Sequence, residues 1–112
     1  MKKLCFIILF LLVISGVFGQ LQNDYRWLVG TWVGSDRDHE EYELVLFDNG
    51  AGFFTNWDGR TVNIVFSIVN HSITVFNVQG HTEIFDSPIF RVNDQRVILF
   101  IEGYHVNFMK RN

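Results

Sequence analysis

The chain has 112 residues, of which 48% are hydrophobic and 16% aromatic, and its formal net charge is −3 at pH 7. That length suffices for one small domain. An acidic chain without a long basic run lacks the electrostatic footprint of a nucleic-acid-binding protein and a polybasic patch for anionic lipid headgroups, so we expect no nucleic-acid partner.

The first 19 residues have the layout of a secretory signal peptide. Lys2 and Lys3 precede an unbroken apolar run over 4–14, and small residues then lead to Gly19. A basic n-region, a short apolar h-region and small residues before the cut are the three parts of such a signal. We predict a signal-peptide helix over residues 1–19, cleavage before Gln20, and a secreted or periplasmic protein.

An uncleaved membrane anchor is the alternative for this segment. Residues 4–18 are too few for a spanning helix, which needs roughly 17–25 residues, so we expect no stable membrane insertion after cleavage. Cleavage removes Lys2 and Lys3, which takes the net charge from −3 to −5, and it removes Cys5, the single cysteine. Residues 20–112 therefore have no disulfide to offset a small core and must rely on burial, for which nine of the twelve phenylalanines and all three tryptophans remain.

Residues 20–112 are predicted to form one all-β domain. Asp24 could cap a short helical turn over 25–28, the only helix expected after the signal. Beyond it, β-type runs alternate with Asn, Asp and Gly turns, and no stretch keeps the 3.6-residue period of a substantial helix. Asp86-Ser-Pro88 is expected to interrupt the ladder, because proline cannot donate a backbone hydrogen bond. We predict a small antiparallel meander β-barrel of about eight or nine short strands, at 31–35, 41–47, 52–57, 60–69, 73–78, 81–85, 89–92, 96–102 and 104–110.

The alternation of side chains along these strands predicts which ones face inward. The expected interior consists of Trp32, Leu44, Leu46, Ile64, Phe66, Ile68, Ile73, Val75, Leu99, Ile101, Val106 and Phe108. Four large apolar residues have the opposite parity: Phe76, Phe85, Ile98 and Phe100. Either β-bulges shift the parity, which we favour because small barrels need them, or these residues form an outward apolar patch that a partner covers.

Several of these segments resemble the short lipocalin-like domains of secreted bacterial proteins. Leu28-Val-Gly-Thr-Trp32 is similar to the Gly-x-Trp signature of the first lipocalin strand, and three other segments, Leu44–Gly50, Ile64–Ile68 and Tyr104–Lys110, resemble later strands of that family. The resemblance implies a barrel in which Trp32 packs across one closed end with a basic side chain from the last strand over its ring. Strand parity makes Lys110 that basic residue.

The densest polar run covers residues 35–43. Asp36, Asp38 and Glu40 alternate, so on an extended strand they would share one face and could hold a hard cation such as calcium. The alternative, which we favour, is a solvated first loop at the mouth of the barrel. The resemblance to lipocalins implies that such a loop gates or lines a ligand mouth.

The sequence offers no catalytic constellation. His39, His71, His81 and His105 are dispersed without the spacing of a zinc site, and no nucleophile elbow, catalytic cysteine or phosphate-binding glycine loop is present. We therefore expect no catalytic residue, no metal and no cofactor, and the hypothesis of a hydrolase-like enzyme has no motif to support it.

Five aromatic residues lie near turns or strand ends: Tyr42, Phe53, Phe54, Trp57 and Tyr104. They either line a mouth for an apolar or sugar ligand or pack the barrel rim. The leading hypothesis is a non-catalytic lipocalin-like binding module for a small hydrophobic ligand or a protein surface. The alternative is a protein-interaction or oligomerisation module, such as a homodimer, with a filled core and no small-molecule ligand.

Overall fold

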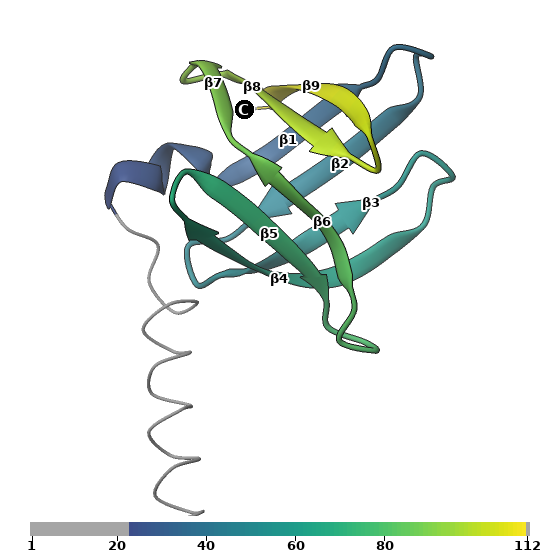
Figure 1. The fold of residues 1–112 in the computed structure, drawn as a ribbon, viewed down its shortest axis with the longest axis horizontal. Helices are drawn as coiled ribbons and strands as arrows, with labels where there is room; N and C mark the ends of the chain where they lie inside the picture. The colour runs from purple at the N-terminus through teal and green to yellow at the C-terminus, as the bar shows by residue number, and fades with distance from the viewer. Residues whose placement is uncertain (1–22, 112) are drawn as a thin grey trace, which may run out of the picture.

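The computed structural model describes residues 23–111, so the predicted signal peptide and its cleavage site lie outside the described residues. The described chain is all-β, with nine antiparallel strands in a nearly closed barrel, as predicted (Figure 1). A short 3₁₀ helix, η1 (Asn23–Leu28), precedes the strands. Within residues 23–111, no helix is long and apolar enough to cross a membrane.

The strands form one sheet in the order β6-β5-β4-β3-β2-β1-β9-β8-β7, so every pair but β1–β9 joins neighbours in the sequence. This is the meander expected from closely spaced turns. The strands are β1 (Gly30–Ser35), β2 (Glu41–Leu46), β3 (Ala51–Thr55), β4 (Thr61–Val69), β5 (Ser72–Asn77), β6 (Glu83–Pro88), β7 (Phe90–Asn93), β8 (Arg96–Ile101) and β9 (Tyr104–Arg111).

Two sequence predictions about element ends are wrong. The helix begins at Asn23, so Asp24 lies inside it rather than in the capping position. Pro88 does not interrupt the ladder but ends β6, opposite Ser72. Pro88 has no backbone N–H to donate, but the pairing continues at the next residue, because Ile89 donates its backbone N–H to the His71 carbonyl at 2.9 Å.

The core contains eleven of the twelve side chains that strand parity predicts, and Ile68, the twelfth, packs half-buried against it. Phe85 is also buried, because the register shifts between Val75 and Phe76 and so brings Phe85 opposite Val75. A bulge thus accounts for Phe85. The other three opposite-parity residues, Phe76, Ile98 and Phe100, stay half-buried outside the core.

The barrel closes between β6 and β8 through the side chain of Ser87. β6 crosses the front of the molecule from β5 to β7 (Figure 1), and Ser87 on it is fully buried. The Ser87 Oγ accepts the Phe100 backbone N–H of β8 at 2.8 Å and donates to the Pro88 carbonyl at 2.7 Å. One hydroxyl therefore joins two strands that are not neighbours in the hydrogen-bonded order.

Ser87→Ala should lower the free energy of unfolding by about 1–3 kcal/mol, because it leaves the Phe100 N–H without its acceptor. Urea unfolding monitored by tryptophan fluorescence measures this. Thr74→Ala is the control, because it removes an exposed hydroxyl–carboxylate bond from β5 to Asp86, the neighbour of Ser87 on β6, and should cost under about 1 kcal/mol. Equal losses in the two variants would contradict the role of Ser87 in closure.

Candidate functional site

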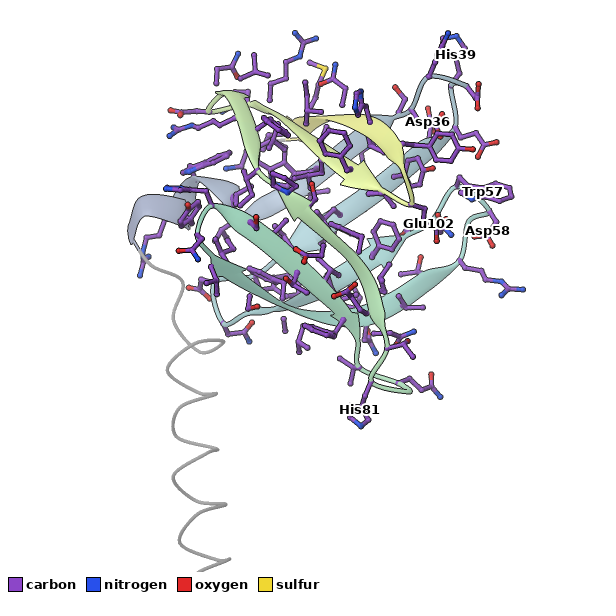
Figure 2. All side chains as sticks on the ribbon, viewed as in Figure 1. Asp36, His39, Trp57, Asp58, His81 and Glu102 are labelled. Carbon is purple, nitrogen blue, oxygen red and sulfur yellow. The ribbon has the colours of Figure 1, made fainter. Side chains whose placement is uncertain are left out.

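One end of the barrel gathers the β1–β2, β3–β4 and β8–β9 loops. Figure 2 shows Asp36, His39, Trp57, Asp58 and Glu102 at this end, whereas His81 lies apart at the tip of the β5–β6 turn. We call it the acidic end, because its loops bring together the carboxylates of Asp36, Asp38, Glu40, Asp58 and Glu102.

Asp36 organises the β1–β2 loop at the acidic end. Its side chain is buried, with 8% of the residue surface exposed. The Oδ1 atom accepts the backbone N–H groups of Asp38 and Glu40 at 2.9 and 3.0 Å, and Oδ2 accepts the hydroxyl of Tyr42 at 3.0 Å. A buried carboxylate is tolerated when such hydrogen bonds replace water. The loop is therefore built around this carboxylate.

The cation-site hypothesis for Asp36, Asp38 and Glu40 rested on an extended strand, and the structure forms a tight turn instead. The His39 N–H bonds to the Asp36 carbonyl, and both Asp36 side-chain oxygens are occupied by loop and tyrosine donors. Among residues 23–111, no group of three or more His, Cys, Asp or Glu side chains could hold a metal ion.

Tyr42 is the protonated partner of Asp36. Burial of the ring, the hydrogen bond to Asp36, and the negative charges of Asp36, Glu40 and Glu102 raise the pKa of Tyr42 well above its ordinary value of 10.0. Each of these factors disfavours the phenolate. Tyr42 is therefore a hydrogen-bond donor at all ordinary pH values and is not suited to act as a base.

Tyr42→Phe should cost about 1.5–3 kcal/mol at neutral pH, because the buried Asp36 carboxylate loses a donor. The substitution should also change the alkaline stability. An unfolded tyrosine deprotonates from about pH 10 upward while folded Tyr42 keeps its proton, so its contribution is complete below pH 10 and is lost as the pH rises above it. Urea unfolding at pH 7 and pH 11 should therefore show a smaller alkaline loss in the variant than in the wild type. Tyr104→Phe, at an exposed tyrosine, should leave both values unchanged.

The five aromatic mouth candidates do not form one surface. Tyr42 and Phe54 are buried and stack with their ring centroids 6.3 Å apart. Phe53 points outward and packs edge-on against Phe47, at 5.7 Å. Trp57 and Tyr104 are exposed, by 53% and 49%, in the β3–β4 turn and at the start of β9. Phe53 and Phe54 thus face opposite ways, as their adjacency on a strand requires.

The opposite end of the barrel is closed by Trp32 and η1. Trp32 is completely buried, and its indole N–H donates to the Leu28 carbonyl at 2.8 Å. The Lys110 ammonium lies 5.6 Å from the Trp32 ring centroid and donates to the Trp27 carbonyl at 2.8 Å. Trp27 packs edge-on against Trp32 at 6.1 Å, and the guanidinium of Arg91 covers the Trp27 ring at 4.4 Å. The Trp32–Lys110 contact is the one that strand parity and the lipocalin resemblance implied.

The interior of the barrel is filled by its own side chains. The sixteen buried hydrophobic residues are 0–4% exposed to a water-sized probe, whereas the lining of an open calyx would retain accessible surface. Three surface hollows have volumes of about 590, 280 and 310 Å³, and none of the three is lined by these core residues. A ligand inside the barrel would have to displace packed side chains.

An apolar strip crosses the outer face of β2, β3, β4 and β5. Val45 pairs with Phe53, and Val65 pairs with Phe76. Phe53 lies opposite Asn63, so the apolar connection between the two pairs runs through Ala51, which shares the face of Phe53 and pairs with Val65. Val65, Phe76 and Val78 line the hollow of about 310 Å³, together with Asn77 and His81. Phe47, Phe53 and Val78 are each 40–45% exposed. We call Val45, Phe47, Phe53, Val65, Phe76 and Val78 the outer strip.

The sequence did not predict that Asp36 organises the β1–β2 loop, that Ser87 joins β6 to β8, or that the outer strip forms one surface. The strip could have been found by placing Val45, Phe53 and Val65 on the side opposite to the predicted interior. Ser87 carries no such signal, because its role depends on the approach of β6 to β8. The role of Asp36 depends on how the β1–β2 turn folds around its carboxylate, which an alternating acidic pattern does not show.

No family model, no curated protein and no solved structure matches this chain.

Proposed function

We propose that the protein is a non-catalytic, extracytoplasmic lipocalin-like binding module that recognises a protein surface through the outside of a filled barrel. The observation that carries the proposal is the outer strip, an apolar band with a hollow of about 310 Å³ beside it.

The filled interior favours an outside surface over a calyx. A small-molecule site normally surrounds most of its ligand with apolar walls, and here the inward walls are packed against each other. The outer hollow is open to the surface and lined by five residues, so it suits the insertion of one apolar side chain from a partner rather than the enclosure of a free ligand.

The outer strip has features expected of an interface. Contiguous exposed apolar surface on a small domain marks interaction sites, and aromatic residues are enriched in such surfaces. The strip combines the exposed Phe47–Phe53 aromatic pair with the hollow at Val65 and Phe76.

The proposed location and family rest on the sequence. The basic and apolar N-terminal segment supports export, and Leu28-Val-Gly-Thr-Trp32 supports the lipocalin-like assignment. The contact of Trp32 with Lys110 at the closed end is consistent with that assignment.

The test is photo-crosslinking from the outer strip in cells that produce the protein. Benzoylphenylalanine is placed at Phe53, and at Val69 as the matched control, because Val69 is 60% exposed at the end of β4 outside the strip. A discrete polypeptide adduct from position 53, absent from position 69 and lost when Val65→Asp is added, is the expected result.

Two outcomes would overturn the proposal. An adduct of a few hundred daltons from position 53 would show that a small molecule occupies the hollow. Equal adducts from positions 53 and 69 would show that the outer strip has no preference for a partner over other exposed surface.

A further inference from the structure

Four neighbouring strands of the barrel carry four cations and no acidic residue, although the turn that joins two of these strands contains Asp94. β1, β9, β8 and β7 are adjacent in the sheet and contain Arg91, Arg96, Lys110 and Arg111, but no Asp or Glu. By contrast, β2 and β6 each carry two carboxylates. The net acidity of the chain predicts no basic patch, yet the fold brings together cations that are up to 20 positions apart in the sequence.

Two of these cations are available to a partner. Lys110 is engaged with the Trp27 carbonyl, and Arg91 covers the Trp27 ring and pairs with Asp94. Arg96 and Arg111 are exposed, and within residues 23–111 neither forms an ion pair.

Large apolar side chains stand exposed among the cations. Met109 lies directly opposite Arg96 in the β8–β9 ladder and is 55% exposed. Phe90 and Val92, on the edge strand β7, are 49% and 54% exposed. We call Arg96, Arg111, Phe90, Val92 and Met109 the basic face.

The acidic end lies away from these arginines. Arg96 begins β8 and Glu102 follows its end, so the length of the strand separates the two charges. The other carboxylates of the acidic end, Asp36 and Asp58 among them, belong to loops beside Glu102 (Figure 2). An anionic surface would therefore attract one part of the molecule and repel the other, which fixes the orientation of docking.

We propose that the basic face docks peripherally on a bilayer of anionic phospholipids. Arginines would lie among the headgroups, while Phe90, Val92 and Met109 would reach the boundary of the acyl chains; this combination of charge and apolar insertion defines interfacial membrane binding. A nucleic acid would use the cations but not the aliphatic side chains. The outer strip belongs to β2–β5, so docking leaves it accessible, and this inference does not depend on the proposed protein partner.

The test is co-sedimentation of the exported protein with vesicles. Vesicles of 30% phosphatidylglycerol in phosphatidylcholine should bind the protein, and vesicles of phosphatidylcholine alone should bind it weakly. Each arginine near an anionic surface contributes about fivefold in affinity, so Arg96→Gln with Arg111→Gln should weaken binding roughly 25-fold. Salt at 0.5 M should weaken wild-type binding by screening the same charges.

The matched control is Arg37→Gln with Arg60→Gln, which removes the same charge from exposed positions in the β1–β2 loop and at the β3–β4 turn. This control should leave vesicle binding unchanged, and Met109→Ser should weaken it without changing its salt dependence. Equal losses in the two double variants would show a net-charge effect and overturn the proposal. The wild-type protein could also sediment without vesicles, and Arg96→Gln could abolish that sedimentation. This result would overturn the proposal, because the acidic end of a second copy would then be the partner of the basic face.

Discussion

Trp32→Ala is expected to lower the free energy of unfolding by about 3–5 kcal/mol, the range for removing a large aromatic side chain from a packed core. Trp32 is completely buried, and its loss removes the hydrogen bond to the Leu28 carbonyl and the contacts with Trp27 and Lys110. Chemical denaturation followed by far-ultraviolet circular dichroism gives the change without relying on tryptophan fluorescence.

Trp57→Ala is the matched control for this prediction. Trp57 is 53% exposed on the β3–β4 turn, so the same chemical change should cost under about 1 kcal/mol. A loss below about 1 kcal/mol for Trp32→Ala itself would contradict the closure of the barrel end by this residue.

Gly52→Ala is expected to cost about 3 kcal/mol or more, at or above the upper end of the range for overpacking. A Cβ at this position would lie 1.9 Å from the Val45 carbonyl oxygen, which is backbone and is held in the β2–β3 pairing. The strands would have to separate locally to make room. Thermal unfolding measures the loss.

Gly34→Ala controls for adding a methyl group to a buried strand glycine. Its Cβ would meet side-chain atoms of Phe108 and Val106 at 2.7–2.9 Å, a less severe overlap than the 1.9 Å approach to backbone at Gly52. The loss should therefore be smaller than that of Gly52→Ala. If the two variants lose the same stability, the close approach of β2 to Gly52 is not what requires glycine there.

The strand layout could be predicted because short-range chemistry determines it. Asn49 and Gly50 end β2 with a turn, and the alternation along β4 identifies Ile64 and Phe66 as interior residues without knowledge of any other strand. The Trp32–Lys110 contact could be predicted because the lipocalin resemblance implies a basic side chain over Trp32, and strand parity selects Lys110 on the paired strand.

What the sequence did not reveal depends on contacts between distant segments. The inward position of Phe85 follows from a register shift against β5, and the role of Ser87 from the approach of β6 to β8. The basic face arises because the pairing of β8 with β9 places Arg96 beside Met109 and Arg111, and neither composition nor net charge predicts this arrangement.

The candidate site was predicted less well than the fold. Tyr42 and Phe54 were considered as mouth residues, although both share the parity of core neighbours and are buried. Asp36 was considered as a member of a cation site, but its carboxylate is occupied within the loop because the turn places the Asp38 and Glu40 N–H groups around it. Such local hydrogen bonds cannot be deduced from an alternating acidic pattern.

Native mass spectrometry of the protein, purified without detergent from cells that produce it, tests the filled barrel most directly. A filled barrel predicts a mass equal to that of the polypeptide, or of a whole number of polypeptides, with no smaller component bound in the interior. An additional mass of a few hundred daltons that disappears on denaturation would show a bound ligand. If this mass persists when Val65→Asp alters the outer hollow, the ligand lies inside the barrel, and the filled interior is contradicted.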